Sequence, residues 1–293
     1  MIFLSFTNSK SATKILGLVF VTLGFGVLGI SYYFFFFRIL PDLFSTNKVF
    51  ALTQLVISIW DAWGIGYFYY KAVVTNPGKV PKNIISEEEL SQLKKQYKEN
   101  LDSEFPVYVP YCPYCSSFKP PRTHHDSVMN QCVLKMEHYC PWINNSVGFF
   151  NHKYFVLFTL YLWIGCIYAF LLTAKAFLFQ FGFIDTPDEN FSENVILFSI
   201  LCVTIFLSLS FILFWQFFLV FTNQTTIEFY QRMSFPKAQR PLNPYDFGFK
   251  NNFRDFFDLT RNQSLIYFLF STKLPKGDGM HFHENHHNIK LDV

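Results

Sequence analysis

The chain has 293 residues, of which 51% are hydrophobic, 21% are aromatic and only 15% are charged. Soluble domains usually carry about 25% charged residues, and the apolar residues here collect in long blocks. These features exclude a disordered regulator and a secreted disulfide scaffold. The formal net charge of +3 is too small for the electrostatic footprint of a nucleic-acid-binding domain, so we expect no nucleic-acid partner.

Four apolar blocks are long enough to cross a bilayer, because a helix needs about 20 residues to span the hydrocarbon. The first block exceeds the ~7–15 apolar residues of a signal peptide, so we interpret it as a retained span. The sequence therefore predicts an all-α membrane protein with four transmembrane helices in the lipid bilayer. The blocks cover residues 15–37, 49–70, 154–173 and 195–221.

Basic residues outside these blocks predict which side of the membrane each loop faces. Lys and Arg number ten between residues 71 and 153 and nine after residue 221, whereas the loop before the fourth block holds only Lys175. Basic loops stay on the cytosolic side, so we expect the middle loop and both termini to be cytosolic in an endoplasmic reticulum or Golgi protein. The predicted parts are a tail with two helices (1–70), a cytosolic loop (71–153), two further helices (154–221) and a C-terminal tail (222–293).

Two local features accompany this layout. Asp61 lies inside the second block, where an acid is a candidate functional residue; the alternative is a structural contact with a neighbouring helix. No matching intramembrane cation is evident, so we favour the structural interpretation. In the middle loop, Ser86 followed by Glu89 has the pattern of a capping box and predicts a short amphipathic helix.

Four of the six cysteines fall within 29 residues of the middle loop. Cytosolic cysteines are kept reduced, so this clustering indicates metal binding or catalysis rather than disulfides. A knuckle formed by Cys112 and Cys115, followed by a histidine and by Cys132, is typical of a closed, structural Cys₃His zinc site. The spacing does not choose between His124 and His125 as the fourth ligand.

Cys140 remains outside this zinc site. His138 precedes it by two residues, and Glu137 precedes that histidine. A thiol, an imidazole that removes its proton and a carboxylate that orients the imidazole are the parts of an activated nucleophile. The position of Cys140, shortly before the third block, places such a nucleophile near the membrane surface.

The stretch from Cys112 to Phe155 resembles the cysteine-rich domain of the DHHC protein S-acyltransferases, or palmitoyltransferases. The resemblance is carried by PPRTHH (120–125), CVLKMEHYCPWINN (132–145) and VGFFN (147–151). The four-span layout, with this domain between spans two and three, agrees with it. Further motifs agree outside the domain: NPG (76–78), TTIE (225–228), and NPYDFG (243–248) followed by Asn252.

The departures from the family pattern predict a single zinc ion. The signature Asp-His-His-Cys reads EHYC here (137–140), which keeps the nucleophile, the base and an acid. The resemblance assigns the first zinc site to Cys112, Cys115, His125 and Cys132, all present. It places the second site at four positions whose ligands are all replaced, so we expect packing and hydrogen bonds there and one structural zinc per chain. Those positions are Asp126, Met129, Tyr139 and Ser146.

The resemblance implies transfer of a long-chain acyl group from acyl-CoA, through an acyl-Cys140 intermediate, to cytosolic cysteines of membrane-apposed proteins. His138 is the implied base and Glu137 its orienting acid. A catalytically inactive scaffold or accessory subunit is the alternative, and a channel or transporter has little support. The remaining assignments are Arg122, Lys119, Lys135 and Trp142 for acyl-CoA, Ser31 and Gly165 for the end of the acyl cavity, and Thr225, Thr226, Glu228 and Asn252 as structural motifs.

Overall fold

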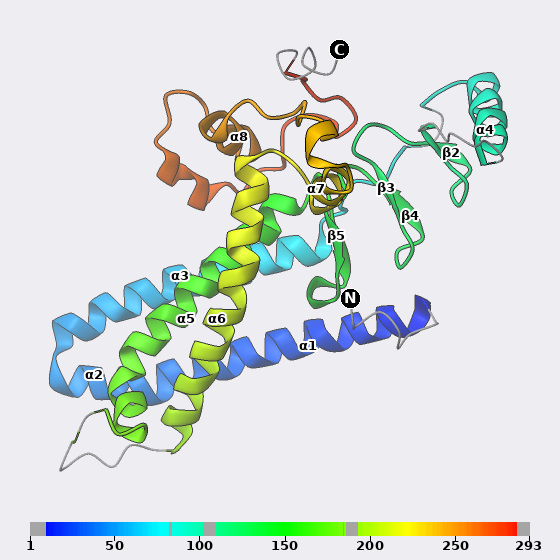
Figure 1. The fold of residues 1–293 in the computed structure, drawn as a ribbon. Helices are drawn as coiled ribbons and strands as arrows, with labels where there is room; N and C mark the ends of the chain where they lie inside the picture. The colour runs from blue at the N-terminus through cyan, green and yellow to red at the C-terminus, as the bar shows by residue number, and fades with distance from the viewer. Residues whose placement is uncertain (1–9, 82–83, 102–108, 184, 186–192, 286–293) are drawn as a thin grey trace. The chain divides into compact units, whose positions relative to one another are not determined.

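The computed structural model describes residues 10–81, 84–101, 109–183, 185 and 193–285 (Figure 1). The chain forms two compact units. The cysteine-rich unit contains the chain up to residue 21, residues 72–153 and the chain from residue 218; the helical unit contains residues 22–71 and 154–217. The middle loop and the C-terminal tail, which the sequence analysis separates, therefore belong to one compact unit.

Among the described residues, four stretches are helical, long and apolar enough to cross a membrane, as the sequence predicts: residues 12–46, 48–74, 152–175 and 193–221. Leu, Ile, Val and Phe dominate all four, and no stretch is broken by an internal turn. The helices that contain them are α1 (Lys10–Phe34), η1 (Phe35–Ile39), α2 (Leu40–Thr46), α3 (Lys48–Val74), α5 (His152–Gln180) and α6 (Glu193–Phe221).

The connection between the first two spans differs from the prediction of a loop over residues 38–48. The chain instead passes through one π-helical turn, η1, and continues as α2 to Thr46. Pro41 stands in the first turn of α2, where its missing N–H leaves no donor unpaired. Asn47 alone breaks the helix, and its Oδ1 accepts a hydrogen bond from Phe50 N at 3.0 Å, which caps α3.

Aromatic side chains fill the core of the helical unit. Gly64 of α3 lies against Tyr161 of α5 so closely that a Cβ atom would come within 2.1 Å of the ring. Close approach at small residues is the usual means of packing membrane helices. The rings of Tyr69 and Phe158 stack with centroids 4.5 Å apart, so α3 and α5 form one packed pair.

The cysteine-rich unit contains strands, which departs from the prediction of an all-α chain. Three antiparallel hairpins place side chains at opposed positions on neighbouring strands. Short strands of this kind are built around turns, and their hydrophobic pattern is too brief to be seen in the sequence. The pairs are β1 (Tyr111–Cys112) with β2 (Ser117–Phe118), β3 (His124–Asp126) with β4 (Gln131–Val133), and β5 (His138–Cys140) with β6 (Asn145–Val147).

The predicted amphipathic helix is confirmed as α4 (Glu87–Leu101). Ser86 N donates to Glu89 Oε2 at 2.9 Å, and Glu89 N donates to Ser86 Oγ at 3.2 Å, which are the two bonds of a capping box. The other helices of this unit are η2 (Pro141–Ile143), α7 (Thr226–Met233), η3 (Lys237–Gln239), α8 (Phe249–Phe256) and η4 (Leu265–Phe270).

A tight turn at residues 76–78 holds the hairpins at the end of α3. Asn76 Oδ1 accepts from Gly78 N at 3.0 Å, and Gly78 adopts φ = +119°, which favours glycine. Gly78 O then accepts from Leu134 N at 2.7 Å. This turn fixes the strand that carries Cys132.

Candidate active site and metal centre

The predicted metal ligands come from two hairpins of the cysteine-rich unit. Cys112 ends β1, and Cys115 lies in the turn that follows it. His125 on β3 is directly opposite Cys132 on β4, and directly opposed residues place their side chains on the same face of a ladder. The two hairpins thus supply two ligands each.

The ligand atoms of these four residues all lie within 4.8 Å of one another, so the group could hold a metal ion. His125 Nδ1 is 3.2 Å from Cys115 Sγ and 3.6 Å from Cys112 Sγ. Ligands at about 2.0–2.3 Å from a tetrahedral ion are separated by roughly these distances. His124, the alternative that the spacing left open, is outside the group.

The four positions of the second, replaced site are bonded within the protein. Ser146 Oγ donates to Asp126 Oδ2. Asp126 Oδ1 accepts from the backbone N–H of Met129 at 3.1 Å, and Tyr139 OH donates to Asn144 Oδ1 at 2.9 Å. Hydrogen bonds between protein groups therefore occupy this region.

Cys140 and His138 lie on strand β5, two residues apart, and so face the same side of the strand. The His138 side chain hydrogen-bonds to Cys140, and His138 Nδ1 lies 3.5 Å from Glu137 Oε1. Cys140 is 6% exposed and the Glu137 side chain is fully buried, whereas the His138 side chain is 34% exposed. The predicted nucleophile thus contacts the predicted base, and the base contacts the predicted acid.

Glu137 is held in place by the first residue of α7, which lies beside the β5 hairpin (Figure 1). Thr226 donates its backbone N–H to Glu137 Oε2 at 2.6 Å and its hydroxyl to Glu137 Oε1 at 2.5 Å. The N-terminus of a helix also favours a negative charge. Both carboxylate oxygens are therefore bound, and the side chain is oriented toward His138.

These contacts shift the acid–base properties of the pair. Burial alone would raise the pKa of Glu137, but the hydrogen bond from His138, the positive charges of His152 and His138, and the Thr226 hydroxyl lower it to about 2. Burial would lower the pKa of His138, yet its hydrogen bonds to Cys140 and Glu137 outweigh burial and raise this pKa to about 10. The geometry thus favours an imidazolium beside the Cys140 sulfur.

A buried ion pair joins the cysteine-rich segment to α7. Arg122 Nε and Nη2 bind Glu228 Oε1 and Oε2 at 2.7 and 2.8 Å, and Arg122 Nη2 also donates to the Asn223 carbonyl oxygen at 3.0 Å. The guanidinium lies 4.2 Å from the centroid of the Tyr245 ring. Arg122 is therefore buried and paired with Glu228, and it also lines a cavity together with Lys135 and Tyr245.

The predicted structural motifs converge on the same region. Thr225 caps α7 and forms a capping box with Glu228. Asn252 is 1% exposed; its Nδ2 donates to Phe221 O at 2.7 Å, and its Oδ1 accepts from Phe247 N at 2.9 Å. The C-terminal segment is thereby fixed to the end of α6.

The other residues assigned to acyl-CoA are dispersed. Trp142 is 54% exposed, and its ring lies 4.6 Å from that of Phe20. Lys135 Nζ is 3.5 Å from Asn223 Oδ1, and burial together with the charge of Arg122 lowers the pKa of Lys135 to about 7. Lys119 is half-buried. Lys135 lines the same cavity as Arg122, whereas Lys119 and Trp142 are not among the residues that line it.

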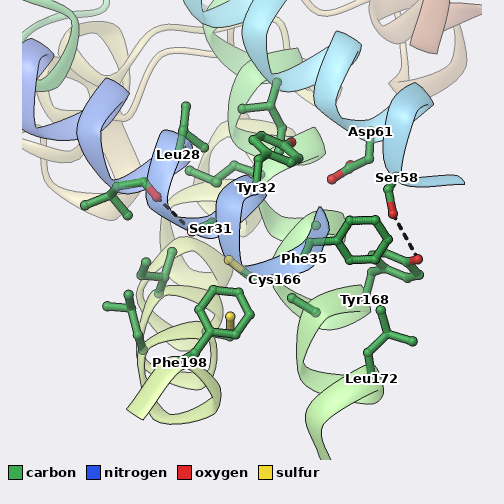
Figure 2. A pocket seen from close by; sticks show the side chains of 18 of the residues that line it. Leu28, Ser31, Tyr32, Phe35, Ser58, Asp61, Cys166, Tyr168, Leu172 and Phe198 are labelled. Atoms are coloured by element: carbon green, nitrogen blue, oxygen red, sulfur yellow. Dashed lines mark hydrogen bonds between the residues drawn. The ribbon is translucent and has the colours of Figure 1, made fainter. Parts of the chain in front are cut away.

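In the helical unit, Ser31 and Gly165 line one and the same cavity (Figure 2). The lining is mostly apolar, but it includes Asp61. Sequence reasoning missed this position of Asp61, as well as the contacts of Thr226 and Arg122. The PPRTHH and TTIE motifs contain Arg122 and Thr226, but neither motif reveals which residues these side chains contact.

We expect Arg122→Ala to cause a large loss of stability, because removing one partner of a buried ion pair costs about 3–5 kcal/mol. The measurement is the temperature at which purified protein loses its monodisperse peak after heating. Lys95→Ala is the matched control, because Lys95 and Glu99 form an exposed pair, 3.8 Å apart, worth about 0–1 kcal/mol. Equal effects of the two substitutions would contradict a structural role for Arg122.

Comparison with known proteins agrees with the geometry. The family model described as DHHC palmitoyltransferase matches residues 109–233. Palmitoyltransferase ZDHHC20-A of Danio rerio is 30% identical over 249 residues, covering 77% of this chain and 69% of the relative. Palmitoyltransferase ZDHHC3 of Rattus norvegicus is 40% identical over 143 residues, covering 48% of this chain and 45% of the relative. Palmitoyltransferase ZDHHC2 of Danio rerio is 29% identical over 237 residues, and the chain spans 63% of its length.

Proposed function

Because the chain belongs to the DHHC palmitoyltransferase family, we propose that it is a protein S-acyltransferase that forms a thioester on Cys140. The acyl donor is a long-chain acyl-CoA, and the acceptors are cytosolic cysteine thiols of membrane-associated proteins. The observation that carries the proposal is the contact of Cys140 with His138 and of His138 with a buried, doubly bound Glu137.

The chemistry proceeds in two thioester exchanges. The Cys140 sulfur attacks the carbonyl carbon of acyl-CoA, the bond from that carbon to the CoA sulfur breaks, and CoA leaves as a thiol with the proton held by His138. The acceptor thiol then gives its proton to His138 and attacks the carbonyl carbon of acyl-Cys140. The bond from that carbon to the Cys140 sulfur breaks, and Cys140 is released as the thiolate. Glu137 stabilises the imidazolium in both steps.

A catalytically inactive scaffold is the second candidate, motivated by the four replaced positions of the second metal site. Incubation of the purified protein with acyl-CoA, followed by a peptide that carries one cysteine, separates the two functions. The enzyme is expected to form a protein thioester and then to pass the acyl group to the peptide. A protein that forms no thioester under these conditions is a scaffold.

We propose that the ion held by Cys112, Cys115, His125 and Cys132 is zinc, one per chain. Three thiolates and one imidazole suit Zn²⁺, and four protein ligands leave no open coordination position. The ion would supply folding stability to a unit with a small core. It takes no part in acyl transfer.

The membrane topology follows from the same proposal. The cysteine-rich unit and both termini face the cytosol, in agreement with the excess of Lys and Arg in these segments. The protein resides in endoplasmic reticulum or Golgi membranes and meets its substrates at the bilayer surface. The proposed contacts of acyl-CoA are Arg122, Lys119, Lys135 and Trp142.

Glu137→Gln tests the proposed role of the acid. Loss of the neighbouring carboxylate is expected to lower the pKa of His138 from about 10 by about 1–3 units. The wild type should load acyl groups up to about pH 10, whereas the alkaline limb of the variant should move to lower pH because His138 loses its proton earlier. The measurement is the initial rate of acyl loading between pH 6 and pH 10.

Glu137→Asp is the conservative control for this profile, since it keeps the charge. A Glu137→Gln profile that falls at the wild-type pH, with only a lower plateau, would assign Glu137 a purely structural role. Cys140→Ser, measured at each pH, corrects for acyl-CoA hydrolysis in solution.

We also propose that the acyl chain occupies the cavity lined by Ser31 and Gly165, so that side-chain volume there sets the preferred chain length. Ser31→Leu should shift preference from eighteen-carbon toward sixteen-carbon acyl-CoA, since each buried methylene contributes about 0.8 kcal/mol. Gly165→Tyr should act in the same direction. A Cβ atom at residue 165 would come within 2.5 Å of Asp61 Oδ2, so Ser31→Leu is the cleaner variant.

Competition between the two acyl-CoA species, read as the ratio of acyl adducts, measures this preference. Unchanged ratios in both variants would show that the cavity ends elsewhere. The alternative for Gly165 is close helix packing, which predicts lower stability with no change in chain preference.

A further inference from the structure

Asp61 is an unusual member of the cavity in the helical unit. Its side chain comes from α3 and points toward the space between Tyr32 and Phe35 (Figure 2). The residue is 5% exposed, and within the described part of the chain its Oδ1 has no hydrogen-bond partner. A buried polar atom without a partner is costly, and this oxygen can accept a hydrogen bond from a group that enters the cavity.

Three hydroxyl groups that line the same cavity, those of Ser31, Ser58 and Tyr168, are bonded elsewhere. Ser31 Oγ donates to Val27 O of its own helix at 2.8 Å. Ser58 Oγ donates to Gln54 O at 2.8 Å and lies 3.1 Å from the Tyr168 hydroxyl (Figure 2). The structural interpretation of Asp61 favoured from the sequence therefore finds no neighbouring helix that bonds Oδ1 within the described residues.

The remaining lining is suited to a chain of methylene groups. It includes Leu28, Phe35, Leu172 and Phe198, with the small residue Gly165. The cavity has a volume of about 80 Å³. At about 10–15 Å³ for each water-sized group, it admits roughly six such groups, which is the end of a long chain rather than the whole chain.

We propose that this cavity selects an acyl chain that carries a hydroxyl group at its far end, with Asp61 Oδ1 accepting the hydrogen bond of that hydroxyl. The inference rests on the proposed function, in which the acyl chain of the substrate occupies the cavity. A carboxyl group keeps an acceptor oxygen whether it is ionised or protonated. A neutral hydroxyl is also far less costly to bury than an ammonium group.

A chain that ends in a methyl group leaves Oδ1 unpaired or bonded to a trapped water. Sites built to bond a substrate hydroxyl discriminate strongly against the analogue that lacks it, because the buried polar group is then left without its partner. We therefore expect a preference of about tenfold for the ω-hydroxylated chain over the plain chain. A hydroxyl in the middle of the chain would face apolar side chains and should be disfavoured.

The test is a competition on the full-length purified protein with equimolar palmitoyl-CoA and 16-hydroxypalmitoyl-CoA. Intact-mass spectrometry after a short incubation gives the ratio of the two Cys140 adducts. The wild type should favour the ω-hydroxylated chain about tenfold, and it should not favour 12-hydroxypalmitoyl-CoA over palmitoyl-CoA. A wild-type ratio near one, or equal preference for the 12- and 16-hydroxylated chains, would overturn the proposal without any variant.

Substitutions at Asp61 then assign the preference to one atom. Asp61→Leu should reverse the ratio in favour of palmitoyl-CoA, and Asp61→Asn, which keeps an acceptor oxygen, should retain a preference for the hydroxylated chain. Gln54→Leu is the matched control, since it removes another buried polar side chain from α3 outside the cavity lining; its ratio should equal that of the wild type. An unchanged ratio in Asp61→Leu would refute selection by Asp61, whereas failure of the wild type to load either chain would refute the acyltransferase function itself.

Discussion

Cys140→Ser is expected to abolish acyl labelling that is sensitive to hydroxylamine, because the thioester intermediate needs the Cys140 sulfur. A serine hydroxyl beside His138 is a much weaker nucleophile toward a thioester, and an ester formed there would resist neutral hydroxylamine. Loss of the covalent step should reduce acyl transfer to a peptide by at least about 10³-fold, in the range seen when an essential nucleophile is removed. The measurement is labelling of purified protein with a fluorescent or radioactive acyl-CoA.

Two controls make this result specific. Cys202→Ala removes a buried thiol from α6 that lines the proposed acyl cavity. Labelling at residue 140 should persist in this variant and remain sensitive to hydroxylamine, whatever its chain-length preference. Metal content and the monodisperse peak of Cys140→Ser should equal those of the wild type, because Cys140 is outside the four-residue metal cluster. Wild-type labelling in Cys140→Ser would reject the covalent mechanism and favour the scaffold function.

Cys132→Ala is expected to remove the metal and to lower the yield of folded protein. The apparent binding free energy of structural Zn²⁺ in small domains is about 10–16 kcal/mol, and this energy stabilises the fold. Loss of one of the three thiolates therefore destabilises the two hairpins that carry the metal ligands. The strand that carries the nucleophile belongs to the same unit. The measurements are zinc content by elemental analysis and the folded fraction after purification.

The number of zinc ions per chain distinguishes one metal site from two. The wild type should contain about one zinc per chain, the content of a single Cys₃His site, and His124→Ala should keep it because His124 is outside the cluster. Two zinc ions per chain would show that the region of Asp126 and Ser146 still binds metal. Loss of zinc in His124→Ala would reassign the fourth ligand.

Local patterns in the sequence were sufficient to predict the elements whose stability depends on residues close together in the chain. The four long apolar helices follow from hydrophobic length, and the capping box at Ser86 and Glu89 is formed by residues three apart. The metal cluster is likewise recognisable because its ligands come from hairpins with short, fixed gaps. These features need no knowledge of distant contacts.

The parts that escaped prediction depend on residues far apart in the chain. Glu228 pairs with Arg122 across 106 positions, and Thr226 bonds Glu137 across 89 positions. The sequence alone does not show that Arg122 has a carboxylate partner, so the hypothesis for this residue named only a phosphate of acyl-CoA. The helical connection through η1 and α2 was missed because Pro41 and the charges around it are typical of a loop as well as of a helix start.

The bond from Thr226 to Glu137 has a consequence for judging divergent members of the family. A chain truncated just after α6 would retain the whole EHYC signature and still lose the two groups of Thr226 that bind the Glu137 carboxylate. The EHYC signature alone is therefore not sufficient to predict catalytic activity, because its acid, Glu137, is oriented by Thr226 of the C-terminal tail. A sequence with an altered signature can be an active or an inactive relative. The better criterion is whether it keeps both the acid of the signature and the residue at the start of α7 that binds this acid.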